Sequence, residues 1–101
     1  MSSFKGLSRL EYLILTLLHD RESFGLELVE RSEGLLKRGT IYVTLARMQE
    51  KGYVVSRTEV LSPGAIGLPR RLYRPTAYGV EVFKVWSRAE RALARLRPQE
   101  A

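Results

Sequence analysis

The chain has 101 residues, which is enough for one small domain with a modest hydrophobic core and too few for two. Seventeen Lys and Arg residues against eleven Asp and Glu give a formal net charge of +6, an excess that favours an anionic partner, with nucleic acid ahead of a membrane surface. The lack of cysteine and the single histidine exclude disulfides, thiol chemistry and histidine-rich metal sites, and we expect no cofactor.

We expect no secretory targeting signal, because residues 1–6 lack the apolar run of such a signal. The longest apolar stretch, residues 12–18, is interrupted by Thr16 and is far too short to span a bilayer. We therefore expect a cytoplasmic protein with no membrane partner.

The first predicted helix begins after Ser8, which forms a capping-box spacing with Glu11. Between residues 10 and 20, apolar side chains recur three and four positions apart. Tyr12 and Leu15 add apolar surface on the opposite side of this helix. A helix that is apolar nearly all round is buried nearly all round, which in so small a protein indicates that a second chain covers it.

Two further helices are predicted before the middle of the chain. Ser23 can cap a short helix over residues 24–31. Thr40 can cap a third helix that runs to Lys51, and Gly52 can end it in the left-handed conformation. The core-facing residues of this third helix are Ile41, Leu45 and Met48.

The pattern then changes to strands. Residues 53–60 are rich in β-branched side chains and predict one strand, and residues 70–74 predict a second. The two prolines and two glycines of residues 61–69 predict a long loop at the tip of a hairpin. Thr76 can cap a last helix that runs to about residue 97, is stopped by Pro98 and is about 30 Å long.

The order of these elements predicts the fold class. Three helices followed by a two-stranded hairpin form a winged helix-turn-helix, so we expect an α+β fold with one long C-terminal helix. Residues 1–76 are expected to form the DNA-binding domain and residues 77–101 a dimerisation helix, the two making one compact unit.

Five stretches of the sequence, in this order, resemble the PadR family of transcriptional regulators. They are LEYLIL at residues 10–15, FGLEL at residues 24–28, GTIY, LARM and KG between residues 39 and 52, PRRLYR at residues 69–74, and TAYG at residues 76–79. The resemblance covers about residues 7–97. It implies a dimeric regulator, usually a repressor and often of genes for detoxification or efflux, and the single helix after the wing is similar to the short-tailed branch of the family.

The outer face of the third helix is the surface that can reach base edges in the major groove. Lys37 and Arg38 precede its positive end, where side-chain charge and free backbone N–H groups converge on phosphate. The resemblance implies a phosphate contact by the hydroxyl of Tyr42, and Val43 and Arg47 are candidates for reading bases. Alternatively, Thr40 only caps the helix and Tyr42 is only a packing residue. The candidates here are Lys37, Arg38, Thr40, Tyr42, Val43 and Arg47.

The predicted hairpin adds Arg57, Arg70 and Arg71 as candidates for DNA contact. Guanidinium groups on the flank of a hairpin suit phosphate or a narrow minor groove. Because neighbouring residues of a strand point to opposite faces, Arg70 and Arg71 cannot both do this equally. The sequence leaves open which of them does, and either can instead be a solvated surface charge.

An apolar seam in the last helix recurs with gaps of four, three, four and three residues, the a/d spacing of a coiled coil. About two heptads are too few to hold a coiled coil alone, but together with the first helix they can close a homodimer. In the alternative, the seam packs on its own domain. The candidate dimerisation residues are Leu15, Val82, Trp86, Ala89, Leu93 and Leu96.

Trp86 is also a candidate ligand-binding residue. The WSR stretch at residues 86–88 resembles the same helix in multidrug-responsive short members of the family, in which a Trp from each subunit can line a cavity and stack on planar ligands. The resemblance thus implies a planar aromatic or phenolic small-molecule effector, which aromatic faces suit chemically. The alternative is a Trp that belongs to the core.

These features predict a sequence-specific regulator that binds double-stranded DNA as a homodimer, on a near-palindrome with half-sites about 34 Å apart. One alternative is a winged-helix module that binds a protein and has lost DNA binding, and another is recognition of double-stranded RNA by shape. Enzyme activity is the weakest alternative, because the sequence has no clustered carboxylates, no metal-ligand spacing and no Gly-rich phosphate loop. We therefore expect no catalytic residues.

Overall fold

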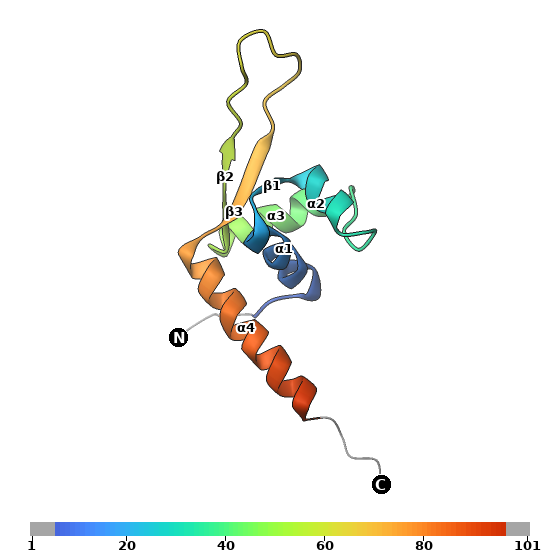
Figure 1. The fold of residues 1–101 in the computed structure, drawn as a ribbon, viewed down its shortest axis with the longest axis vertical. Helices are drawn as coiled ribbons and strands as arrows, with labels where there is room; N and C mark the ends of the chain where they lie inside the picture. Colours follow the sequence, from blue (N-terminus) through green and yellow to red (C-terminus); the bar gives the residue numbers. More distant parts are fainter. Residues whose placement is uncertain (1–5, 97–101) are drawn as a thin grey trace.

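Four helices and three short strands follow one another in the computed structural model, which describes residues 6–96 (Figure 1). The elements are α1 (Arg9–Asp20), β1 (Ser23–Phe24), α2 (Gly25–Arg31), α3 (Ile41–Glu50), β2 (Val54–Thr58), β3 (Arg71–Pro75) and α4 (Ala77–Arg95). The expected α+β fold, a winged helix-turn-helix followed by one long helix, is confirmed. The last helix ends at Arg95, about two residues before the expected end, and Pro98 lies outside the described residues.

The start of α1 is a capping box, as the sequence predicts. The Ser8 hydroxyl accepts a hydrogen bond from the backbone N–H of Glu11 at 3.1 Å, and the Glu11 carboxylate accepts one from the N–H of Ser8 at 2.9 Å. The carboxylate is buried, and its second oxygen lies 2.6 Å from the ammonium of Lys51, which follows α3. One side chain therefore fixes the start of α1 and ties it to the end of α3.

Leu15 corrects one expectation about α1. This helix is not covered all round, since Leu10 and Thr16 are exposed, and its buried side is covered by the same chain: Leu15 is 1% exposed and belongs to the core cluster with Ile14 and Leu18. Its side chain is therefore not available to a second subunit. The apolar pattern of a helix therefore does not show which segment buries each of its sides.

Ser23 does not cap α2, and this expectation is wrong. Ser23 and Phe24 form the short strand β1, which pairs with β3 at Tyr73 and Leu72. A two-residue strand leaves no repeating pattern in the sequence, and its partner lies about 50 positions away in the chain. The capping position belongs to Phe24, whose backbone N–H donates to the Glu27 carboxylate at 3.3 Å.

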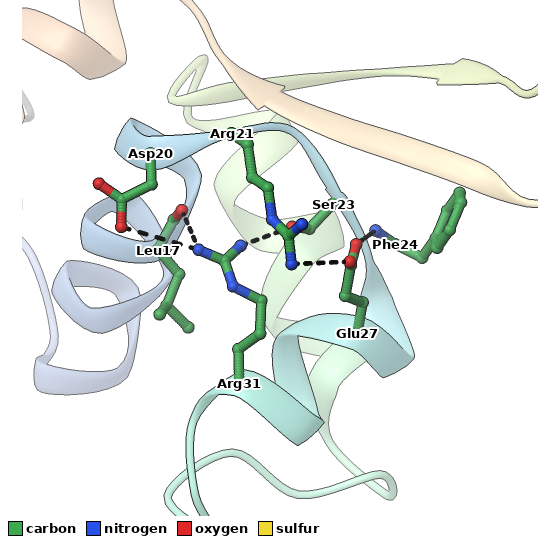
Figure 2. A network of polar contacts seen from close by, with 7 residues as sticks. All are labelled: Leu17, Asp20, Arg21, Ser23, Phe24, Glu27 and Arg31. Carbon is green, nitrogen blue, oxygen red and sulfur yellow. Dashed lines mark hydrogen bonds and ion pairs between the residues drawn. The ribbon is translucent and has the colours of Figure 1, made fainter.

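The buried hydroxyl of Ser23 joins a polar network around Arg31 (Figure 2). The Arg31 guanidinium donates to the Ser23 hydroxyl at 2.6 Å and to the backbone carbonyl of Leu17 at 2.9 Å, and it lies 3.8 Å from the carboxylate of Asp20. It therefore bonds a carbonyl in the last turn of α1, where the helix dipole favours positive charge. The network fixes α2 against α1 and β1.

The helix α3 is anchored by the three side chains that its spacing predicts. Ile41, Leu45 and Met48 are buried in the core beside Leu28 and Val54. The helix ends as expected, since Gly52 has φ +81° and donates its N–H to the Gln49 carbonyl at 3.0 Å. Thr40 occupies the capping position but makes no side-chain capping bond, because its backbone already belongs to a turn closed onto the carbonyl of Lys37.

The sheet has the order β1-β3-β2 with antiparallel pairing throughout. The wing is the hairpin of β2 and β3, in register from Val54 opposite Pro75 to Thr58 opposite Arg71, and the Glu59 N–H donates to the Arg70 carbonyl at 2.7 Å beyond it. Its tip projects away from the helices (Figure 1). Large apolar side chains of the tip are exposed: Val60, Ile66 and Leu68.

The last helix begins as expected, with the Thr76 hydroxyl accepting a hydrogen bond from the N–H of Gly79 at 2.8 Å. Its first half packs on α1, where Phe83 stacks on Tyr12 with ring centroids 5.5 Å apart. Val82 is buried in this contact within its own chain, so the expectation that it faces a partner is wrong. None of the helices in residues 6–96 is long and apolar enough to cross a bilayer.

Candidate nucleic-acid interface

The outer face of α3 and the turn before it form a continuous exposed surface. Tyr42 and Val43 in the first turn are about half exposed, and Thr40, Arg47, Lys37 and Arg38 are exposed as well. Within residues 6–96, the cationic side chains of Lys37, Arg38 and Arg47 make no ion pair. Their charge is therefore open to a ligand from solution.

The ring of Tyr42 packs against the first residue of α2. A Cβ atom built on Gly25 would lie 2.6 Å from Cε1 of Tyr42 and 3.0 Å from its hydroxyl oxygen. The ring is therefore held on one side by the backbone of α2, while half of its surface faces solvent. The ring thus packs as the alternative interpretation expects, while its exposure leaves the tyrosine accessible to a ligand.

The three wing arginines lie on two different faces of the sheet. Arg71 follows the alternation of the buried Tyr73, and its guanidinium donates to the Ser56 hydroxyl at 3.0 Å. The same hydroxyl lies 3.5 Å from the side-chain oxygen of Gln49 on α3. Arg71 is therefore on the face of the wing that continues towards α3.

Arg70 and Arg57 lie on the opposite face and are held by carboxylates. The Arg70 guanidinium donates to both oxygens of Glu59 at 3.3 Å and lies 3.8 Å above the ring of Phe24. Arg57 donates two hydrogen bonds to Glu22, which precedes β1. Arg70 and Arg71 both line the groove beside Tyr42 of α3, but Arg70 is paired with Glu59, and Arg57 is not among the residues that line this groove.

These contacts set the charge of the wing. The hydrogen bond from Arg57 holds the pKa of Glu22 below its usual value, and the one from Arg70 does the same for the pKa of Glu59. Both carboxylates therefore stay ionised at neutral pH and offset two of the three predicted wing charges. Burial raises the pKa of Tyr73, which lies beside Arg71.

Sequence reasoning missed the residues that hold this surface in place, namely Glu22, Phe24, Gly25 and Glu59. Each acts through a partner that is distant in the sequence, such as Arg57 for Glu22 and Tyr42 for Gly25. The cross-strand pair of Glu59 and Arg70 was the most accessible signal, because opposite charges face each other across a hairpin once its register is known.

Residues 14–85 match the sequence profile of the transcriptional regulator PadR-like family, which is more than half of the chain. The chain belongs to this PadR-like family. It is accordingly a DNA-binding transcription regulator and not an enzyme. No curated protein matches the sequence.

Solved PadR structures have the same fold. A PadR family transcription regulator from hypervirulent Clostridium difficile R20291 is 24% identical with a TM-score of 0.73, over 84% of this chain and 90% of that one. A PadR-like transcription factor from Bacteroides fragilis is 23% identical with a TM-score of 0.73, over 86% and 84%. Bacillus subtilis PadR, solved with operator DNA, is 22% identical with a TM-score of 0.68, over 92% of this chain and 50% of that protein.

The PadR-like regulator also has an open groove of about 910 Å³ between α1 and α4. Trp86 is partly buried and lines this groove, whose other lining residues include Leu10, Leu13, Leu35 and Glu90. Further along α4, Ala89, Leu93 and Leu96 are exposed. Of the six expected dimerisation residues, four therefore lie on accessible surface and two, Leu15 and Val82, lie in the core.

Proposed function

We propose that this PadR-like chain is a transcriptional repressor that acts in the cytoplasm and binds a near-palindromic operator as a homodimer. The observation that carries the proposal is the exposed α3 surface, where Lys37, Arg38 and Arg47 have no carboxylate partner in the described part of the chain. Such a surface can bind phosphate without first giving up an internal ion pair. The Bacillus subtilis relative, which was solved with operator DNA, supports this choice of ligand.

In this proposal α3 enters the major groove and its side chains divide the work. Arg47 and Val43 contact base edges, since an arginine can bond guanine in two places and an apolar side chain suits the thymine methyl group. Tyr42 donates its hydroxyl to a phosphate, and Lys37 and Arg38 bind phosphates near the start of the helix. Thr40 lies between these groups and contacts the backbone. On the wing, Arg71 rather than Arg70 or Arg57 is the DNA-contacting arginine.

Residues 77–101 serve as the dimerisation helix of the DNA-binding domain formed by residues 1–76. The carboxyl-terminal half of α4 supports this, because Leu93 and Leu96 expose apolar surface on the side of the seam. A second copy, related by a twofold axis, would cover this surface and part of the α1–α4 groove. The same axis would separate two copies of α3 by about 34 Å, one turn of DNA.

A binding titration tests the proposed DNA recognition. Labelled genomic fragments are titrated with the protein at several salt concentrations, and affinity for a preferred fragment should fall steeply as salt rises. Arg47→Ala should weaken that binding by about 1–3 kcal/mol and relax the preference for one base position. Arg91→Ala removes an equal charge from the exposed face of α4 and is the matched control. Absence of any preferred fragment at moderate salt would refute the proposal.

The oligomeric state is tested separately by sedimentation. Leu93→Glu should convert a dimer to a monomer, because it places a charge in the apolar seam that the dimer would bury. Arg91→Glu on the neighbouring exposed face should leave the dimer intact. A wild-type chain that sediments as a monomer at micromolar concentration would contradict this part.

A small-molecule effector is the last part of the proposal, and Trp86 supports it by lining the α1–α4 groove. A planar cation or phenolic acid that stacks on the indole should quench its fluorescence and release the DNA fragment. A panel of both compound classes that changes neither signal would remove the effector from the proposal while leaving DNA binding in place.

A further inference from the structure

The junction between β1 and α2, Phe24 followed by Gly25, contacts both DNA-facing elements of the molecule. Gly25 touches the ring of Tyr42 on α3, and Phe24 carries the guanidinium of Arg70 from the wing. We propose that this dipeptide is a positioning element that sets the recognition helix and the wing relative to each other. This inference rests on the proposed function, since its consequence is measured on DNA binding.

Gly25 is a glycine for reasons of space and not of backbone conformation. Its φ is not positive, and it is the first residue of a right-handed helix, where any residue fits the backbone. A Cβ at this position, however, would lie 2.6 Å from Cε1, 2.8 Å from Cζ and 3.0 Å from the hydroxyl oxygen of Tyr42. The outer end of the Tyr42 ring therefore occupies the space that a side chain at position 25 would need.

The atoms that touch Gly25 are those that carry the hydroxyl group. The far edge of the ring is thus supported where it needs to be fixed, although half of the side chain is exposed. Tyr42 also lies with Arg70 and Arg71 on the wall of one open groove of about 630 Å³, which Glu27 and Glu30 line as well. A phosphate oxygen at the mouth of this groove would meet a phenol donor and a guanidinium that are already in place.

Phe24 supports the wing from the same point. Its backbone pairs with Leu72 of β3, and its ring lies 3.8 Å from the guanidinium carbon of Arg70, which also binds Glu59. A guanidinium over an aromatic face is attracted to it, and here the contact joins the base of the wing to the start of α2. Phe24 therefore holds the wing through its own ring, and the neighbouring Gly25 holds α3 through the ring of Tyr42.

The test is a double-mutant cycle of Gly25→Ala and Tyr42→Ala, with DNA affinity and thermal stability measured for each variant. Gly25→Ala should weaken DNA binding about tenfold, the effect of losing a hydrogen bond to a charged group. It should leave the salt slope unchanged, because the slope counts phosphates neutralised by Lys and Arg and the phenol of Tyr42 is neutral. In the Tyr42→Ala background it should leave the affinity unchanged as well, because the ring that it displaces is gone.

An equal loss of affinity from Gly25→Ala in both backgrounds would overturn the proposal, because the glycine would then matter only for the fold. Phe24→Leu provides the second arm: it keeps apolar bulk but removes the ring face under Arg70. Hydrogen exchange should then speed up in residues 57–71 and stay unchanged in α3. Unchanged exchange in the wing would refute the role of Phe24.

A readout without DNA separates this inference from the proposed function. The ring current of Tyr42 should move the Hα resonances of Gly25 away from their ordinary positions in the free protein, and Tyr42→Ala should abolish that shift. If no DNA fragment binds but this shift is present, the proposed function fails while the contact stands. Ordinary Gly25 resonances in the wild-type protein would overturn the inference whatever the DNA result.

Discussion

The helix α3 and the wing both present positive charge, but they are held in place by different forces. Three fully buried side chains, Ile41, Leu45 and Met48, anchor α3 in the core. The wing beyond the core is held by surface contacts, chiefly Arg57 with Glu22 and Arg70 with Glu59 and Phe24. Burial of apolar surface is insensitive to salt and to moderate pH, whereas exposed ion pairs are sensitive to both.

The same contrast governs the charges that each element can offer to DNA. Arg47, Lys37 and Arg38 have no ionic partner within residues 6–96, whereas Arg57 and Arg70 already bind carboxylates. A phosphate can therefore bind at α3 without competition. At the face of the wing that carries Arg57 and Arg70, it must displace Glu22 or Glu59. Under the proposed function, we therefore expect α3 to supply most of the binding energy and the wing to contribute chiefly through Arg71.

The largest expected effect comes from truncating one of the buried side chains that anchor α3. Leu45 is 0% exposed, so Leu45→Ala should destabilise the chain by about 2–5 kcal/mol through lost burial and a cavity. Chemical denaturation monitored by circular dichroism measures this loss. Val43→Ala in the same helix removes two methyl groups from an exposed position and should stay within about 0.5 kcal/mol. Similar losses for both variants would mean that α3 is not anchored by burial.

The next effect distinguishes the two neighbouring arginines of the wing, a question that the sequence alone leaves open. Arg71→Ala should weaken DNA binding for all sequences alike and reduce the salt slope by about 1, because it removes one phosphate contact. Arg70→Ala should leave the slope unchanged, since its guanidinium is paired with Glu59 on the other face. Salt-dependent anisotropy titrations of both variants provide the comparison, and a larger slope change for Arg70→Ala would reverse our assignment.

What the sequence predicts well are the features with local causes. The capping residues Ser8 and Thr76, the turn at Gly52 and the buried face of α3 all follow from contacts within a few positions of the chain. These features were sufficient for the fold class and for the exposed surface of α3. They depend on the spacing of residues along the chain, which the sequence shows directly.

What the sequence predicts poorly depends on partners far along the chain. Ser23 has the composition of a helix cap, yet it pairs with Tyr73 and accepts a hydrogen bond from Arg31. Leu15 fits a partner-facing surface, but it is buried within its own chain. The space at Gly25 is likewise defined only once Tyr42 packs on it. Tertiary contacts of this kind override local preference.

A smaller effect tests the electrostatic hold on the wing. The pKa of Glu22 is lower in the folded chain than its ordinary value of 4.5, chiefly because Arg57 donates a hydrogen bond to its ionised form. This contribution is therefore fully present above the ordinary value and is lost as the pH falls through the lowered one. Glu59, whose pKa is also lowered by Arg70, behaves in the same way.

Hydrogen exchange, corrected for its intrinsic pH dependence, should therefore show the wing opening in acid while α3 stays protected. The double variant Glu22→Gln and Glu59→Gln should remove that dependence and show the same protection at acid and neutral pH. A wing whose corrected protection is constant with pH in the wild-type protein would show that these ion pairs do not hold it.

The smallest effect is expected at the tip of the wing, from a side chain of the same composition as Leu45. Ile66 is 100% exposed, so Ile66→Ala removes no buried surface and should change the free energy of unfolding by less than about 0.5 kcal/mol. The two truncations form a matched pair in which aliphatic side chains of equal size differ only in burial. Denaturation midpoints that fall equally for both would mean that the free wing tip packs on the domain, and the contrast between a buried anchor and a surface-held wing would no longer hold.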